Sequence, residues 1–327
     1  MQLLPVESIH AQKLVEKSKV YALLKGFSGE PSYALDKLYD LMVRFGKLVE
    51  SLENISAFEI NPVIVTLTDV WAVDGKVIIN LLHRAKRDII KSTKTSGGIK
   101  FKTAKTLSHT VQASTYHYFE FEPEAPLDFI PGQYISVKVA DSRINCYSVA
   151  DCTGNTKFNL FVDTKPGGPG SNFFETLKVG DPIYYIGPFG TFGLKPDDGA
   201  KTLLFLATGS GCAPFRCMIE HALREKGYTK PITLYIGLNH SQDVFWIDYL
   251  ENLKREFTNF NYKIAVWKPD NSWKGHVGFI TDLVKQDYPD ASQCSAYLCG
   301  AKPMIDSATE LLKQLGCLEK RIYMEKF

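Results

Sequence analysis

The apolar residues of this chain follow two different periods, and the changes between them divide it into parts. Over residues 8–19 and 33–52 they recur every three or four positions, which is the period of an amphipathic helix. Residues 58–67 and 70–80 are rich in β-branched and aromatic side chains, which predicts two strands with a turn between them. Residues 1–90 are therefore predicted to form a small α/β module.

The next stretch of the chain is basic and contains small residues. Lysine and arginine dominate residues 84–105, and Ser, Thr and Gly residues surround Gly97 and Gly98. Such a composition favours a solvated tether over a site for an acidic partner. We assign residues 91–100 as a linker.

The remaining residues predict two different architectures in succession. In residues 101–198, strand signals recur every 8–12 residues and are separated by glycine and proline, which predicts a small antiparallel barrel. In residues 199–327, apolar strands alternate with helices, which predicts a doubly wound parallel sheet. The expected strands are 202–207, 232–237, 262–267, 296–299 and 321–325, and the expected helices are 172–177 within the barrel and 214–226, 244–257, 281–286 and 303–315 around the sheet.

Composition narrows the class of protein. The chain has 327 residues, of which 45% are apolar and 23% charged, as in globular proteins. A net charge of +2 gives no reason to expect a nucleic acid as partner. No apolar run approaches the ~20 residues that cross a bilayer, so we expect no membrane span and a cytoplasmic protein.

The cysteines and histidines predict no metal site. Seven cysteines, an odd number scattered over the second half of the chain, are typical of reduced thiols. The spacing of Cys294 and Cys299 resembles part of an iron–sulfur loop, but the further cysteines of such a loop are missing. The seven histidines do not have the spacing of zinc ligands.

A glycine turn follows the first predicted strand of the parallel sheet. Gly209 and Gly211 allow the backbone to approach a pyrophosphate, and Pro214 stands near the first position of the next helix. The lysine and hydroxyl residue of a Walker motif are absent. The turn alone therefore does not identify the nucleotide.

Seven short motifs of mixed chemistry follow one another along residues 101–327. In this order they resemble the ferredoxin-NADP reductase superfamily, and most of all the flavin/NAD(H) reductase components of bacterial multicomponent oxygenases, without the fused ferredoxin of those components. The motifs are Phe129-Ile-Pro-Gly-Gln-Tyr134, Asn145-Cys-Tyr-Ser-Val-Ala150, Gly167-Gly-Pro-Gly-Ser-Asn172, Gly187-Pro-Phe-Gly-Thr-Phe192, Thr208-Gly-Ser-Gly-Cys-Ala-Pro-Phe215, Cys299-Gly-Ala-Lys-Pro-Met304 and Tyr323-Met-Glu-Lys-Phe327.

The resemblance implies an FAD site in the barrel. Tyr147 offers a flat face to the isoalloxazine ring, and Ser148 offers a hydroxyl to the flavin N5 atom, the hydride acceptor. The family has an arginine for a flavin phosphate where this chain has Asn145, and Arg143, on the same strand face, is the expected substitute. The alternative is a weaker flavin site. Three further residues match the turn that holds the FAD pyrophosphate, namely Gly168, Gly170 and Ser171.

The resemblance also implies a nicotinamide site. It places Cys299 beside the hydride-bearing carbon as a positioning residue and Glu325 near the flavin edge. Phe327 either stacks on the flavin or belongs to a frayed terminus. We expect NADH in preference to NADPH, because no Lys or Arg occurs in residues 237–241. The implied dinucleotide-binding residues are Gly209, Gly211, Pro214 and Asn239.

Residues 1–90 carry a second resemblance. Residues 23–31 and 58–63 resemble the closing part of the ATP-grasp domain of ADP-forming acyl-CoA synthetases. Ser28 replaces the arginine of that motif, and Glu59 replaces its aspartate. Glu59 and Asn61 are too few ligands for Mg²⁺. A relic or docking module is therefore favoured over an ATP site.

Together these patterns predict a flavin-dependent oxidoreductase. It would pass hydride from NAD(P)H to FAD and then single electrons to a separate redox protein, such as a ferredoxin, a flavodoxin or an oxygenase component. A second subunit would contact residues 1–90. The alternatives are a non-catalytic electron-transfer or regulatory subunit, and a subunit of a nucleotide-dependent acyl-CoA ligase.

Overall fold

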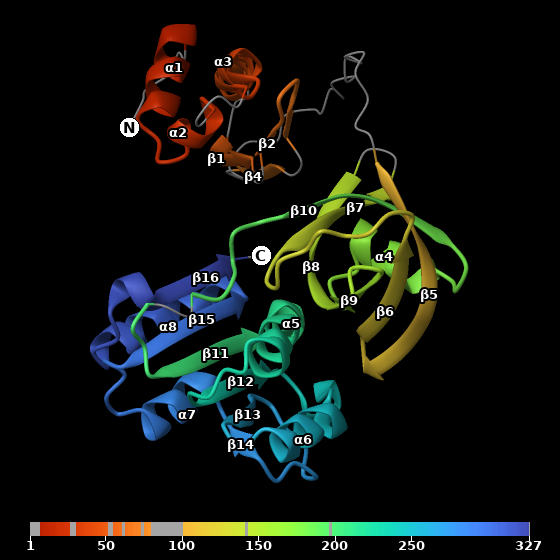
Figure 1. Ribbon diagram of the computed structural model, residues 1–327, viewed down its shortest axis with the longest axis vertical. Helices are drawn as coiled ribbons and strands as arrows, with labels where there is room; N and C mark the ends of the chain where they lie inside the picture. The colour runs from red at the N-terminus through yellow and green to blue at the C-terminus, as the bar shows by residue number, and fades with distance from the viewer. Residues whose placement is uncertain are drawn as a thin grey trace. The chain divides into compact units, whose positions relative to one another are not determined.

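The chain divides into two compact units, residues 1–98 and 99–327 (Figure 1). The computed structural model describes residues 7–26, 31–51, 55–60, 63–72, 75–79, 101–140, 143–195 and 198–326. Each unit has its own secondary structure and is considered by itself.

The N-terminal unit consists of helices and short strand pairs. Helix α1 packs against α3 and buries Ala11 and Val15. Strand β1 pairs with β4, β2 pairs with β3, and Lys37 on α3 forms an ion pair of 2.7 Å with Asp69 in the β2–β3 turn. The elements are α1 (Ser8–Glu16), α2 (Tyr21–Leu24), α3 (Leu35–Ser51), β1 (Ile55–Ile60), β2 (Val63–Val65), β3 (Val70–Ala72) and β4 (Gly75–Ile79).

Six antiparallel strands close into a barrel, as the strand signals predict. The order around the barrel is β10-β5-β6-β9-β8-β7, and its core is lined with aromatic and branched side chains such as Phe119, Phe158 and Ile135. One helix, α4 (Pro169–Thr176), begins three residues before the predicted one and buries Phe174 in this core. The strands are β5 (Lys102–Ala113), β6 (Tyr116–Pro123), β7 (Tyr134–Ala140), β8 (Arg143–Thr153), β9 (Lys157–Asp163) and β10 (Pro182–Phe189).

The C-terminal part is a six-stranded parallel sheet in the order β14-β13-β12-β11-β15-β16, which confirms the predicted fold class. The strand order changes direction at β11, the point at which such sheets bind ligands outside their carboxyl ends. The strands are β11 (Thr202–Thr208), β12 (Ile232–Leu238), β13 (Phe260–Val266), β14 (His276–Val277), β15 (Cys294–Gly300) and β16 (Ile322–Lys326), and the helices are α5 (Ala213–Glu220), α6 (Ile247–Glu256), α7 (Ile280–Asp287) and α8 (Lys302–Gln314).

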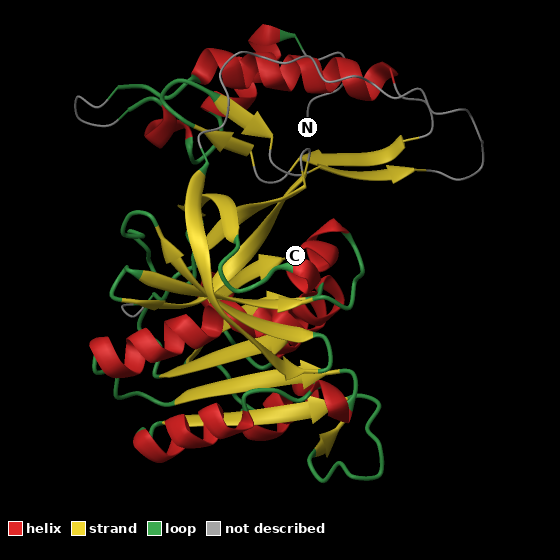
Figure 2. Ribbon diagram, turned by 90° about the vertical axis from the view of Figure 1, so that its right-hand side faces the viewer, coloured by secondary structure: helices red, strands yellow, loops and turns green. Residues whose placement is uncertain are grey.

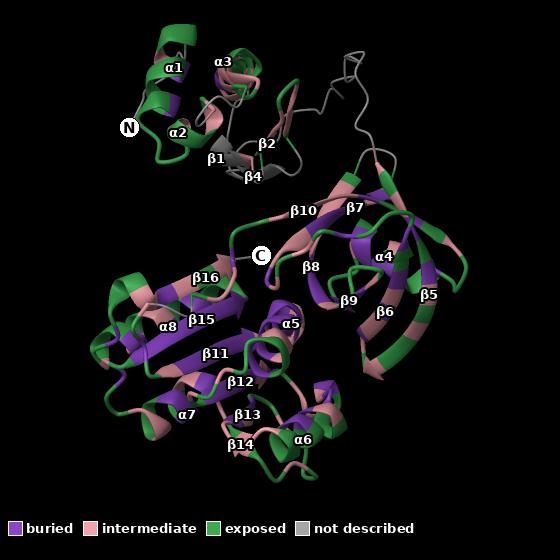
Figure 3. Ribbon diagram, viewed as in Figure 1, coloured by how far each residue is buried: buried purple, intermediate pink, exposed green. Residues whose placement is uncertain are grey.

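Helices cover both faces of this sheet (Figure 2). Side chains alternate along β11, so Phe205 packs with α5 and α6 on one face, whereas Leu204 and Leu206 pack with α7 and α8 on the other. The central strands β11, β12 and β15 are accordingly buried along most of their length (Figure 3).

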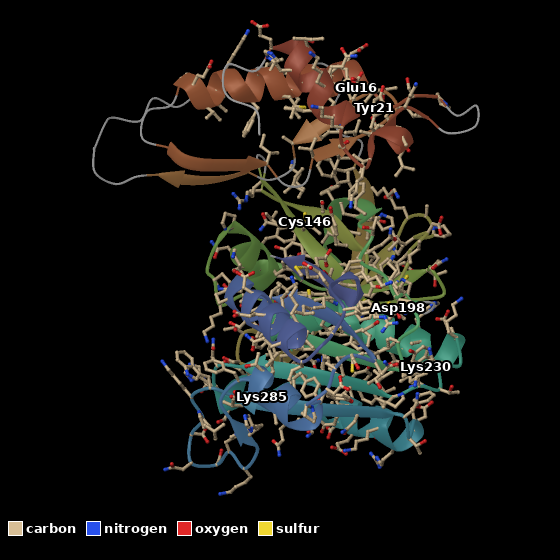
Figure 4. All side chains as sticks on the ribbon, turned by 90° about the vertical axis from the view of Figure 1, so that its left-hand side faces the viewer. Glu16, Tyr21, Cys146, Asp198, Lys230 and Lys285 are labelled. Atoms are coloured by element: carbon tan, nitrogen blue, oxygen red, sulfur yellow. The ribbon has the colours of Figure 1, made fainter. Side chains whose placement is uncertain are left out.

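The barrel and the sheet share one core. Tyr116, Ala150 and Phe161 from the barrel pack in the same cluster as the α5 and α6 side of the sheet. The chain enters the sheet at Asp198, and Lys230 donates a hydrogen bond to the carbonyl of Ala200 at 2.7 Å; Asp198 and Lys230 are labelled in Figure 4. The two domains are therefore fixed to each other by packing as well as by the chain.

Hydrogen bonds also determine the charge state of Asp198. Burial alone would raise its pKa, but Ser295, the backbone N–H of Ala200 and Tyr323 donate to the carboxylate and lower the pKa below its usual value. The Tyr323 hydroxyl donates at 3.0 Å, and Ser295 lies on β15. A charged aspartate thus ties the entry of β11 to β15 and β16.

Candidate functional site

A row of polar side chains lies on strand β8. Arg143 Nε donates a hydrogen bond to Asn145 Oδ1 at 3.0 Å, and Asn145 Nδ2 donates to Tyr147 Oη at 3.4 Å. The three residues are two apart, so they share one face of the strand. Burial raises the pKa of Tyr147 to about 12, while the hydrogen bond from Asn145 opposes this rise. The phenol is therefore neutral, and Arg143 brings the only charge of this row.

The glycine-rich turn before α4 lies against this row. Gly168 is the N-cap of α4, and nothing lies within 4 Å of where its side chain would begin. A side chain at Gly170 would come within 2.3 Å of Tyr147 Oη. Gly170 is therefore required by the close approach of Tyr147. Gly167 N–H donates to Ser171 Oγ at 3.1 Å, which closes the turn.

Ser148, Glu325 and Cys299 come together although they are far apart in the sequence. Ser148 Oγ donates a hydrogen bond to Glu325 Oε2 at 3.3 Å. Glu325 on β16 is the register partner of Cys299 on the neighbouring strand β15. Burial raises the pKa of Glu325 to about 7, and the bond from Ser148 partly opposes this rise.

Cys299 is a buried thiol at the end of β15. Burial raises its pKa well above the usual value, with a smaller contribution from the charge of Glu325. Burial thus favours the uncharged thiol, which is a weaker nucleophile than the thiolate.

The glycine turn packs tightly against the end of β15. A side chain at Gly211 would come within 2.4 Å of the Cys299 carbonyl oxygen, and Gly209 has a φ of +53° beside the Tyr116 hydroxyl. Pro214 occupies the first turn of α5, as expected. Only glycine allows these approaches, so the turn and the β15 end form one rigid edge.

A cleft of about 810 Å³ opens at this edge. Gly209, Gly211 and Asn239 line it, together with the carboxyl ends of β11, β12 and β15. Tyr116 and Asp163 of the barrel also line the cleft, which the sequence analysis did not predict. Asp163 accepts a hydrogen bond of 2.6 Å from Thr115. Among the described residues that line the cleft, none is a lysine or an arginine.

Two aromatic side chains lie at the mouth of this cleft. Trp267 and Phe279 are stacked with their ring centroids 6.1 Å apart, and both are about half exposed. Lys268 Nζ lies 4.0 Å from the centroid of the Trp267 ring. This pair was not predicted from the sequence, although an aromatic residue at the end of a predicted strand and another just before a predicted helix were a usable signal.

Some predicted residues fall outside the described part of the chain, namely Phe327, Ser28 and Asn61. Glu59 lies on β1, opposite Lys76. Within the described residues, no group of three potential metal ligands occurs and no helix is long and apolar enough to cross a membrane.

A closed antiparallel barrel followed by a doubly wound sheet, with a cleft at the strand ends, defines the two-domain fold of the ferredoxin-NADP reductases. Residues 99–193 match the family of oxidoreductase FAD-binding domains, and residues 205–310 match the family of oxidoreductase NAD-binding domains. The chain thus contains an FAD-binding and an NAD-binding oxidoreductase domain. Residues 1–79 match the ATP-grasp domain family.

Curated relatives are similar to this chain over about 200 residues. The toluate 1,2-dioxygenase electron transfer component of Pseudomonas putida is 32% identical over 203 residues, which are 62% of this chain and 59% of that protein. The phenol 2-monooxygenase reductase component DmpP of Pseudomonas sp. (strain CF600) is 33% identical over 210 residues, again 62% of this chain and 59% of the relative. The chain therefore spans less than two thirds of either relative.

Solved structures have the same fold. The Amycolatopsis cytochrome P450 reductase GcoB superposes with a TM-score of 0.65 and 24% identity, over 80% of this chain and 76% of that one. A ferredoxin NADP+ reductase from Neisseria gonorrhoeae, with bound FAD and NADP, superposes with a TM-score of 0.62 and 19% identity, over 70% of this chain and 99% of that one.

Proposed function

We propose that this chain is an FAD-dependent oxidoreductase that passes hydride from NADH to FAD and then single electrons to a separate acceptor protein. One observation carries the proposal: Ser148 on β8 of the barrel donates a hydrogen bond to Glu325 on β16, which pairs with Cys299 on β15. We call β8 the flavin strand. When bound, FAD supplies the chemistry of accepting two electrons as hydride and releasing them one at a time.

The residues on the barrel side fit a flavin nucleotide. The N-terminus of α4 favours the negative charge of a pyrophosphate, and the open space at Gly168 leaves its backbone accessible. Arg143 is the positively charged residue of the row on β8. It would bind the flavin phosphate in place of the family's arginine, at whose position this chain has Asn145. Tyr147 offers an uncharged aromatic face, and the hydroxyl of Ser148 would be available to the flavin N5 atom.

On the nicotinamide side, the protein orients the coenzyme and supplies no nucleophile. The rigid edge formed by Gly211 and Cys299 would limit how closely the coenzyme approaches the sheet, and the neutral thiol of Cys299 would lie beside the nicotinamide ring. The pKa of Glu325 is about 7, so its carboxyl group, beside the hydroxyl of Ser148, can hold or release a proton near neutral pH. Phe327 is proposed to cover the flavin before the coenzyme enters.

The lining of the cleft supports NADH in preference to NADPH. A 2′-phosphate requires a cation, and the described lining residues include no lysine or arginine but do include the carboxylate of Asp163. The exposed rings of Trp267 and Phe279 offer faces on which an adenine can stack. If NADPH were preferred, Lys268 and His240 at this mouth would be its candidate partners.

The partners are proposed from chemistry alone. The acceptor is a ferredoxin, a flavodoxin or an oxygenase component. Residues 1–90 contact a second subunit, because the long apolar stripe of α3 is only partly buried among the described residues. The seven cysteines are thiols that form no disulfide, which supports a reducing compartment, the cytoplasm.

The test is the absorption spectrum of the purified protein before and after anaerobic addition of NADH. We expect a bound, non-covalent flavin spectrum that bleaches on addition of NADH. A colourless protein that cannot be reconstituted with FAD would contradict the proposal. A flavin that is present but not reduced by NADH or NADPH would favour a non-catalytic electron-transfer subunit.

A further inference from the structure

Arg216 on α5 lies buried between the barrel and the parallel sheet. Only 16% of its side chain is exposed, and its guanidinium carbon lies 3.9 Å from the ring centroid of Tyr249. Tyr118 and Trp246 present their rings at 5.0 and 5.1 Å. Tyr118 belongs to β6 of the barrel, whereas Trp246 and Tyr249 stand at the start of α6. A single cation is thus surrounded by rings from both domains.

Among the described residues, the one ion pair that Arg216 forms within 4 Å has its acidic partner in the barrel. Asp151 on β8 lies 3.9 Å from Arg216 Nη2. Burial raises the pKa of Asp151, and the charge of Arg216 opposes this rise. Glu220, one turn further along α5, instead forms an ion pair with Arg224. Removing Arg216 would therefore leave the half-buried Asp151 carboxylate without its ion-pair partner.

The guanidinium of Arg216 is held mainly by the faces of the three rings and by Asp151, and less by hydrogen bonds. Arg216 Nε, Tyr118 Oη and Trp246 Nε1 are buried and have no hydrogen-bond partner in the part of the chain that the structure describes. A planar guanidinium can stack on several rings at once, whereas the compact ammonium of lysine cannot. Trp246 also has a left-handed backbone, with a φ of +59°, which persists in a bulky residue only where its surroundings enforce it.

Three of the four segments that meet at Arg216, namely α5, β8 and the start of α6, belong to or adjoin the proposed cofactor sites. Helix α5 follows the glycine turn directly and packs against β8, the strand of Ser148. Helix α6 follows the loop that contains Asn239. We propose that Arg216 is a positioning residue that sets the barrel against the sheet and so determines the distance between nicotinamide and flavin. The effect of this role on the rate of flavin reduction rests on the proposed function.

The kinetic test compares Arg216→Met and Arg216→Lys with Arg255→Met, a control at an exposed arginine on α6. Anaerobic rapid mixing with NADH gives the limiting rate of flavin reduction. We expect a loss of about 10- to 100-fold for Arg216→Met, because displacements of about 1 Å cost this much in rate. The affinity for FAD and the apparent Kd for NADH should stay within about threefold of wild type. Arg216→Lys should not restore the rate, and Arg255→Met should match wild type.

A second measurement does not depend on NADH. Hydrogen exchange, followed by mass spectrometry of peptides from β6, β8 and the start of α6, should become faster in Arg216→Met and stay unchanged in Arg255→Met. Unchanged exchange would overturn the proposal, and so would faster exchange with an unchanged limiting rate, since Arg216 would then be purely structural. Recovery of the rate by Arg216→Lys would also refute it. If wild-type flavin is not reduced by NADH, the proposed function fails, and exchange alone decides whether Arg216 fixes the two domains.

Discussion

The partly buried carboxyl group of Glu325 should make the protein less stable as the pH rises from about 5 to about 8. Its pKa is about 7 in the folded protein, against 4.5 for an ordinary glutamate. Between these values the folded state keeps a proton that the unfolded state has lost, so unfolding is increasingly favoured as the pH rises. The contribution to stability is complete below about pH 4.5 and is lost by the time the pH passes the folded pKa of about 7.

The size of the effect follows from the difference between the two pKa values. Each unit of difference corresponds to about 1.4 kcal/mol, which gives an upper value of about 3 kcal/mol. Because Glu325 is not fully buried and water screens part of the charge, we expect about 2 to 3 kcal/mol. Glutamine resembles the protonated acid in shape and cannot ionise. The variant Glu325→Gln should therefore lack this loss of stability at high pH.

The assay is urea denaturation of the flavin-free full chain near pH 5 and near pH 8, followed by tryptophan fluorescence. The free energy of unfolding of wild type should fall relative to Glu325→Gln by about 2 to 3 kcal/mol between the two pH values. The variant Glu122→Gln, at an exposed glutamate on β6, should show no such difference from wild type. If the free energies of unfolding of wild type and Glu325→Gln differed by the same amount at both pH values, the reasoning would be refuted.

The other predictions concern the flavin strand, the coenzyme, the glycine turn and the N-terminal unit. Ser148→Ala should slow flavin reduction more than it weakens FAD binding, since the contact matters most as hydride arrives; equal losses would contradict the role. Steady-state kinetics should give a higher kcat/KM for NADH than for NADPH. Gly211→Ala should raise the KM for NADH about tenfold or more, because its Cβ would lie 2.4 Å from the Cys299 carbonyl oxygen; an unchanged KM would argue against a rigid edge. A chain beginning at Ile99 should keep FAD and NADH oxidation, and calorimetry of the full chain should detect no ATP binding; saturable binding that Glu59→Ala abolishes would favour the ligase-subunit alternative.

The architecture of residues 101–327 was predictable because its signals are local. Strand signals at short intervals predict the barrel, and continuous apolar segments that alternate with helices predict the doubly wound sheet. The N-terminal unit was less predictable: the expected strand over 58–67 is instead divided between β1 and β2, which pair with different strands. Helix α2 was missed because only four residues form it, too few for a periodic pattern.

The candidate site was predictable only through the resemblance. The hydrogen bond between Ser148 and Glu325 joins residues 177 positions apart, and no periodicity along the chain indicates it. The pKa of Glu325 depends on burial, which is a property of the folded protein. The rings around Arg216 were missed for the same reason, since Tyr118, Arg216 and Trp246 meet only after the barrel and the sheet have packed together.

The distribution of thiols makes the flavin strand the natural place for a chemical label. Five of the seven cysteines are buried, and burial raises the pKa of Cys217, Cys294 and Cys317 as well as that of Cys299. Thiol reagents react with exposed thiolates, so these side chains are protected. The two partly exposed cysteines, Cys146 and Cys152, both lie on β8. Burial also raises the pKa of Cys152, to about 11. A maleimide dye or spin label on the unaltered protein should therefore attach first at Cys146, beside Tyr147 and Ser148 in the proposed flavin site.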